Sequence, residues 1–196
     1  LLTVSRYGPH SATWHYAGHT SKQSTDQGLS QLASDIADAL FPNSPYAHSE
    51  LVNRNTLSSA AAKAQKDLLH AMLTKCAEPH LGYAAFSADA GLYYSIVRNL
   101  GLHRPAKGAW RFMTPGETER SPHFLPAWQR AEELVLQANR STRLTELYAC
   151  WRAPPFGIKD GLLPIFALSF FLAHRHQLAL FIEGTFTPDV TEAHID

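Results

Sequence analysis

The sequence predicts a mainly α-helical protein: a helical bundle with a small N-terminal β-hairpin and a C-terminal degenerate winged-helix unit. Three observations lead to this prediction. Apolar residues recur at helical spacing in long segments, as in the helix that runs up to Leu40 and in Thr56–Lys75. Short β-type runs lie near the two ends of the chain. The last third has the order helix, turn, helix, hairpin, which is the order of a winged-helix unit.

The composition indicates a globular chain without a strong overall field. Basic and acidic residues number 17 each in 196 residues, so no global charge draws the chain to nucleic acid or membrane. Charged residues make up 17%, below the roughly 25% of typical proteins, which indicates that something outside this chain covers part of the surface. Two distant cysteines, Cys76 and Cys150, suit a reduced, cytoplasmic protein. The longest apolar run, Leu162–Ala173, is too short to span a bilayer, so we expect no membrane partner.

The N-terminal end favours a hairpin. Leu1–Tyr7 and Thr13–Tyr16 read as two strands joined by a turn at Gly8-Pro9, since Trp14 and Tyr16 alternate with His15. The polar segment Thr20–Thr25 reads as a connector. The chain opens on Leu-Leu-Thr without Met, and we expect an excised piece of a longer polypeptide or a processed product.

Four helices are expected before the last third of the chain. Ser24 and Gln27 predict a capping box for the first helix, which Pro42 ends. The others span Thr56–Lys75, about Ala88–Leu100, and Ser121 to about Ala138. Between the last two, Arg104–Thr118 reads as a loop rich in Pro and Gly. This loop predicts a domain boundary, with residues 1–118 forming a β-hairpin plus helical domain and residues 119–196 a helical linker plus winged-helix-like domain.

The second helix of the winged-helix candidate argues against DNA reading. The unit comprises helices at Leu144–Trp151 and Asp160–His176, then strands at Leu178–Ile182 and Thr185–Thr187. A DNA-reading helix exposes Arg, Lys, Asn or Gln to base edges and phosphates. Here apolar residues cover almost the whole circumference, which is typical of a buried helix. We therefore expect its outer face to pack against protein, with three interface residues: Phe166, Phe170 and Phe171.

Two groups of residues could contact nucleic acid or an anion. The first lies at a helix start, where backbone N–H groups can hold a phosphate: Arg54, Ser58, Ser59 and Lys63. The second surrounds Trp110 and Phe112 as a basic patch: Arg98, Arg104, Lys107 and Arg111. In both places a structural interpretation is favoured, namely a tightly packed capped helix and a loop pinned by buried aromatics.

The sequence contains no catalytic signature. It lacks GxxxxGK[ST], GxGxxG, GxSxG and HExxH motifs. Eleven histidines include a group at His10, His15 and His19, but their spacing is unspecific, so a metal-dependent enzyme is the least favoured class. No catalytic, cofactor or metal residue is predicted, and the chain is not expected to be an enzyme by itself.

Two blocks carry a resemblance to a known group of proteins. One is Phe41-Pro42-x-x-Pro45 followed by Glu50–Arg54 and Leu57–Ala62; the other is Arg152–Pro164 with the segments Ala179–Phe181 and Gly184–Phe186. Together they resemble the non-catalytic helical and winged-helix-like region of large bacterial P-loop ATPases, some of them associated with phage defence. The resemblance covers roughly residues 25–190. It implies a module beside an ATPase core, with ATP bound in the parent protein and no catalytic residue in this chain.

The leading expectation is a non-catalytic scaffold or regulatory module of a larger intracellular, defence-related ATPase. It would act through protein–protein packing against other domains or subunits. The alternative is a nucleic-acid-binding winged-helix protein.

Overall fold

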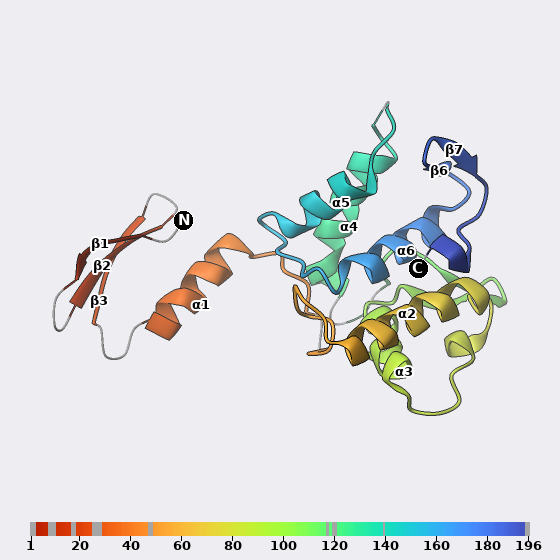
Figure 1. Cartoon of the computed structure of the whole chain (residues 1–196), viewed down its shortest axis with the longest axis horizontal. Helices are drawn as coiled ribbons and strands as arrows, with labels where there is room; N and C mark the ends of the chain where they lie inside the picture. Colours follow the sequence, from red (N-terminus) through yellow and green to blue (C-terminus); the bar gives the residue numbers. More distant parts are fainter. Residues whose placement is uncertain are drawn as a thin grey trace. The chain divides into compact units, whose positions relative to one another are not determined.

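The computed structural model describes residues 3–7, 11–16, 19–24, 29–46, 49–116, 118, 121–138 and 140–194 (Figure 1). Helices dominate its regular structure, as the sequence predicts. The chain divides into two compact units, residues 1–42 and residues 43–196. No helix formed by the described residues combines the length and apolar character needed to cross a membrane.

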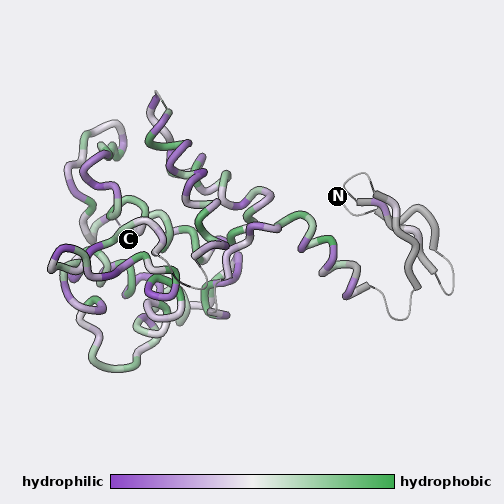
Figure 2. Tube along the Cα trace, turned by 180° about the vertical axis from the view of Figure 1, so that it is seen from behind, coloured by the Kyte–Doolittle hydropathy of each residue, from purple (hydrophilic) through white to green (hydrophobic). Residues whose placement is uncertain are grey.

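The first unit is an antiparallel sheet followed by one helix. Its elements are β1 (Thr3–Tyr7), β2 (Ser11–Tyr16), β3 (His19–Ser24) and α1 (Leu29–Leu40), and the strand order is β1-β2-β3. Figure 2 shows hydrophobic and hydrophilic residues alternating along α1, which is the pattern of an amphipathic helix.

The predicted connector Thr20–Thr25 and the predicted cap at Ser24 are wrong. Residues 19–24 form β3, paired with β2 from Tyr16↔His19 to Ser11↔Ser24. The residues of β3 are mainly Thr, Ser, Lys and Gln, so they show no alternation of apolar and polar side chains. The strand forms through backbone pairing with β2, which the sequence pattern does not reveal. The predicted turn at Gly8-Pro9 and the capping partner Gln27 lie outside the described residues.

The second unit contains the remaining elements. Its helices are α2 (Ser59–Thr74), α3 (Ala88–Leu92), α4 (Ser121–Val135), α5 (Leu144–Arg152) and α6 (Leu163–His174). A turn η1 (Pro79–Gly82) precedes α3, a π-helical turn η2 (Tyr93–Arg98) follows it, and a short turn η3 (Glu192–His194) lies near the end of the chain. Two hairpins complete it: β4 (His103–Ala106) with β5 (Ala109–Phe112), and β6 (Leu180–Ile182) with β7 (Thr185–Thr187).

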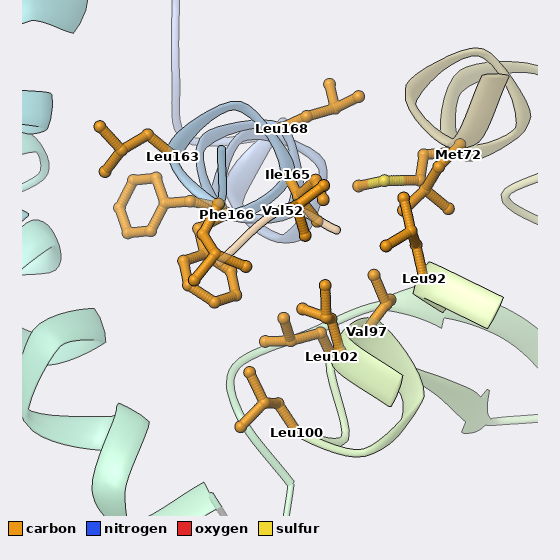
Figure 3. Packing of buried hydrophobic residues seen from close by; sticks show 14 of the residues in the cluster. Val52, Met72, Leu92, Val97, Leu100, Leu102, Leu163, Ile165, Phe166 and Leu168 are labelled. Carbon is orange, nitrogen blue, oxygen red and sulfur yellow. The ribbon is translucent and has the colours of Figure 1, made fainter. Parts of the chain in front are cut away.

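The apolar helix α6 is the central element of this unit. Figure 3 views it nearly end-on, with Met72 of α2 and Leu92 of α3 on one side. On another side the Phe166 ring lies 4.3 Å from the ring of Phe124 in α4. The composition of α6 predicted a buried helix, and this is confirmed. The sequence analysis expected a partner protein to cover its outer face, whereas α2, α3 and α4 of the same chain cover most of the helix. Each buried Leu, Ile or Phe adds about 1.5–3 kcal/mol relative to an exposed one.

A close backbone approach at Gly161 joins the segment before α2 to the segment before α6. The amide of Gly161 donates to the carbonyl of Arg54 at 2.9 Å, and its own carbonyl accepts from Nε2 of Gln65 at 2.7 Å. A Cβ at this position would overlap the backbone oxygen of Val52, so only glycine fits. The amide of Asn43 also donates to Pro155 O, at 3.1 Å. The segments around Asn43 and Arg54 are therefore packed against those around Pro155 and Gly161.

The sequence predicted a loop at Arg104–Thr118, but this segment contains most of the β4–β5 hairpin. Pro105 pairs with Trp110, and Lys107 and Gly108 form the turn with φ angles of 53° and 81°. Positive φ at both central residues is the geometry that matches the twist of paired strands. The predicted boundary at residue 118 falls inside this unit, whose core combines residues from both sides of it, such as Met72 and Phe166.

Candidate interaction groove

An apolar groove lies between α5, α6 and the C-terminal segment of the second unit. Its volume is about 750 Å³. Helix α6 contributes Ala167 and Phe171, and α5 contributes Leu147 and Tyr148. The far wall comes from Leu178–Ile182, Val190 and Ala193. A groove of this size with mainly apolar walls fits an apolar ligand or a segment of another protein.

Large apolar side chains stand exposed at the edge of the groove. Leu144 and Phe181, which both line it, are 55% and 59% exposed. Phe186 pairs with Phe181 across the β6–β7 hairpin, with ring centroids 5.8 Å apart, and is 57% exposed. Adjacent exposed apolar residues beside a groove are typical of interaction sites.

The start of α5 is fixed by a charge-assisted network at the groove edge. Glu146 accepts from the backbone N–H of Arg143 at 3.3 Å and from the Arg140 guanidinium at 2.6 Å. The Thr142 hydroxyl donates to the carbonyl of Leu134, at 3.0 Å, which ties this turn to the end of α4. The Arg143 side chain is thereby placed beside the apolar wall as an exposed cation.

The charged and titratable groups of the groove are few. Among its described lining residues, Arg143 carries a positive charge and no carboxylate occurs. Burial raises the pKa of Tyr148 to about 12 despite the nearby Arg152 cation, so its hydroxyl stays neutral. The groove thus offers apolar contact area with positive charge at one edge.

Glu132 of α4 is half-buried and contacts two aromatic side chains. Its carboxylate accepts from Nε1 of Trp128 at 2.9 Å and lies 3.3 Å from Nε2 of His174. Burial lowers the pKa of His174, while Glu132 opposes that shift. The His174 ring also lies 4.6 Å from the ring of Phe170. This cluster fixes the C-terminal end of α6 to α4.

Of the three predicted interface residues, the structure leaves one accessible. Phe166 is fully buried and Phe170 is 2% exposed, both within the core of this chain. The ring of Phe170 packs 5.1 Å from that of Trp128. Phe170 and Phe171 both border the groove, but of the three only Phe171 is half-exposed. A partner at α6 would therefore contact Phe171 and not the other two.

The first group of predicted anion contacts has structural roles. Ser58 caps α2 by accepting from the amide of Ala61 at 3.3 Å, and Ser59 begins the helix. Lys63 forms an ion pair with Asp67, with 2.5 Å between Nζ and Oδ2. The carbonyl of Arg54 accepts from Gly161. These contacts agree with the capped-helix interpretation favoured by the sequence.

The second group separates into structural and exposed residues. The Arg104 guanidinium donates to the carbonyls of Gly101 and Thr114, and Arg111 donates to the carbonyl of Ala106 at 3.1 Å. Arg98 lies over the ring of Tyr94, 5.4 Å from its centroid, and is exposed, as is Lys107 at the hairpin tip. Within the described residues, Arg104 and Arg111 donate hydrogen bonds to backbone carbonyls, and Arg98 and Lys107 do not.

The histidine group of the N-terminal sheet is only partly described. Nδ1 of His15 lies 3.0 Å from the Thr20 hydroxyl, while His10 and the side chain of His19 lie outside the described part. Among the described residues, no cluster of three or more His, Cys, Asp or Glu side chains suits a metal ion.

The sequence did not identify most residues of the groove. The Glu183-Gly184 turn does fix the register, so that the pairing of Phe181 with Phe186 follows from hairpin geometry. Their exposure depends on what the hairpin packs against, which no local pattern encodes.

Comparison of this chain with protein-family models, with curated protein sequences and with solved structures finds no match.

Proposed function

We propose that the chain is a non-catalytic scaffold or regulatory module that binds an apolar segment of a partner protein in the groove between α5, α6 and β6–β7. The observation that carries this proposal is the groove itself, with Leu144 and Phe181 exposed along it. Neither side chain adds much to the core of this chain, so burying them in a complex gives free energy that folding has left unused.

The chemistry of the groove suggests an amphipathic helix with acidic residues as its occupant. Apolar side chains at i, i+3, i+4 and i+7 suit an elongated groove between elements. Arg143 complements a carboxylate on the flank of such a helix. Charge pairs at the edge contribute mainly to orientation and association rate, whereas the buried apolar anchors contribute most of the affinity.

The order α5, loop, α6 and β6–β7 supports a winged-helix-like relationship for this part of the chain. In that comparison α6 takes the place of the DNA-reading helix. Its residues are buried or half-buried against the chain's own helices, with Ile165 and Phe166 at 0% exposure. The accessible part of α6 is apolar, at Ala167 and Phe171, and offers no donor or acceptor to base edges. We therefore favour a protein partner for this unit over a duplex DNA partner.

The experiment uses an amphipathic helical peptide of roughly 18 residues, about five turns, with Leu on one face and Glu on the other. Binding to the whole chain is measured by isothermal titration calorimetry. We expect saturable binding that Phe181→Asp and Leu144→Asp each weaken at least about tenfold, since each substitution places a charge where an apolar contact is required.

A matched control is Phe86→Asp, because Phe86 is 97% exposed and does not line the groove. Circular dichroism of every variant confirms that the fold is retained. Failure of the peptide to bind, or equal weakening by the control, would contradict the proposal. Phe170→Asp is unsuitable as a test because Phe170 is buried and the variant would unfold with or without a partner.

The resemblance in sequence extends the proposal to the identity of the partner. We propose that the partner is a domain or subunit of a P-loop ATPase, with ATP bound there and with a role in phage defence. The support is the pair of sequence blocks that meet at Gly161. Reading the gene around this chain tests the idea: a GxxxxGK[ST] motif in the same or an adjacent reading frame is expected, and its absence from both would contradict it.

A further inference from the structure

A row of four ring side chains runs across a different part of the second unit. Phe86 lies 6.5 Å from Tyr94, Tyr94 lies 5.9 Å from His80, and His80 lies 4.5 Å from Trp110, measured between ring centroids. The four come from the loop before α3, from η2, from η1 and from β5. Phe86 is 97% exposed and the other three are half-buried. This set is called the ring row below.

The backbone that positions the ring row departs twice from regular structure. His80 and Leu81 both adopt left-handed conformations, with φ of 53° and 55°, and Gly82 follows at 69°. Non-glycine residues adopt this region at a cost of about 1–2 kcal/mol each. Burial of Leu81 stabilises the turn, and the result is that the His80 ring lies against Trp110. The π-helical turn Tyr93–Arg98 carries Tyr94, and such turns are frequent at functional sites.

Positive charge flanks the ring row. The Arg98 guanidinium lies 5.4 Å from the centroid of the Tyr94 ring, and Lys107 occupies the tip of the hairpin that contains Trp110. Burial and the Arg98 cation lower the pKa of His80, so Arg98 and Lys107 are the relevant cations at neutral pH. Glu78 and Asp89 are the acidic residues near the row in sequence, and they oppose part of this positive charge.

We propose that the ring row binds single-stranded nucleic acid, with a base stacking on Phe86 and phosphates lying beside Arg98 and Lys107. Accessible aromatic faces combined with flanking cations form the usual platform for unpaired bases, whereas a duplex hides the base faces. The 97% exposure of Phe86 is the decisive observation, because an exposed ring of this kind adds almost nothing to folding. This site is separate from the apolar groove and does not depend on the function proposed for it.

The test measures fluorescence anisotropy of a labelled oligothymidylate with the whole chain. We expect binding that Phe86→Ala weakens at least about fivefold, the lower limit for loss of one stacked base. Arg98→Gln is expected to reduce the slope of log K against log salt by about 0.7, the loss of one phosphate contact on a single strand. A duplex of the same length is expected to bind more weakly.

The matched control is Phe186→Ala, which removes another exposed ring that is outside the ring row. It should leave oligonucleotide binding unchanged, and Phe86→Ala should leave peptide binding at the groove unchanged. No binding at about 0.1 mM protein, the weak end of non-specific affinities, would overturn the proposal. So would binding that persists in Phe86→Ala and is lost only with Arg98→Gln, since that result indicates electrostatic attraction without stacking.

Discussion

The two hairpins of the second unit have the same kind of turn and opposite environments. Lys107-Gly108 connects β4 to β5 and Glu183-Gly184 connects β6 to β7, each with two consecutive positive φ angles. The first hairpin buries His103 and Phe112, at 1% and 4% exposure. The second leaves Phe181 and Phe186 more than half exposed. The same turn geometry thus occurs in both hairpins, whereas packing decides whether the aromatic residues of a hairpin stabilise the fold or remain available to a partner.

The largest expected effect comes from removing one aromatic ring in each hairpin. Phe112→Ala should reduce the free energy of unfolding by about 3–5 kcal/mol, because it leaves a cavity next to the His103 ring, 4.8 Å away. Phe186→Ala should change it by less than about 0.5 kcal/mol. Urea denaturation followed by circular dichroism measures both. Equal losses would show that both hairpins belong to the core and would remove the basis for the groove proposal.

An intermediate effect is expected from pH, and it belongs to the first hairpin. Nε2 of His103 donates to the carbonyl of Cys76 at 2.9 Å, and Nδ1 accepts from the Tyr93 hydroxyl at 3.0 Å, an arrangement that suits the neutral ring. Burial lowers the pKa of His103, against the hydrogen bond to Cys76, and nearby His80 lowers it further.

The unfolded chain therefore binds a proton at a higher pH than the folded chain does. Stability is complete above the unfolded pKa of about 6.5 and is lost as pH falls below it towards the folded pKa. Each such histidine contributes at most about 1.4 kcal/mol per pH unit. We expect His103→Gln to flatten the dependence of unfolding free energy on pH between about 7.5 and 5.5, as measured by urea titrations at a series of pH values. The pKa values of His80 and His174 are also lowered, so some dependence remains. An unchanged slope would contradict the role assigned to His103.

The sequence predicted the helices well because their evidence is local. The apolar stripe of α2 and the cap at Ser58 lie within a few turns of each other, and the observed helix Ser59–Thr74 falls inside the predicted Thr56–Lys75. The burial of α6 was also predictable from local sequence, because a helix that is apolar around its whole circumference must be covered by some other segment. Propensity and periodicity are properties of neighbouring residues, so no tertiary information was required.

The parts that the sequence missed depend on distant contacts. Phe166 was expected to face a partner, but Phe124 lies against it from a helix that begins at Ser121, far along the chain. The ring row joins His80, Tyr94 and Trp110 from three separate elements, two of them with irregular backbone. Periodicity shows that a face is buried, not which segment covers it, and it carries no signal for a site assembled from short turns.

The smallest expected effect comes from the two turn glycines, Gly108 and Gly184. A Cβ at either position meets no atom within 4 Å, so alanine there adds only the conformational cost of a positive φ, about 1 kcal/mol. In the packed β4–β5 hairpin this cost should appear in global unfolding, because the hairpin and the core come apart together. In β6–β7 we expect it to appear mainly as local opening, with faster amide exchange in residues 180–187 and a change in global unfolding free energy below about 0.5 kcal/mol.

Urea denaturation measures the global unfolding free energy of the Gly108→Ala and Gly184→Ala variants, and hydrogen exchange measures the local opening. If Gly184→Ala lowers global stability as much as Gly108→Ala, the C-terminal hairpin unfolds with the core. The wall of the groove is then as rigid as the rest of the unit, and the two hairpins differ only in what their outer faces expose.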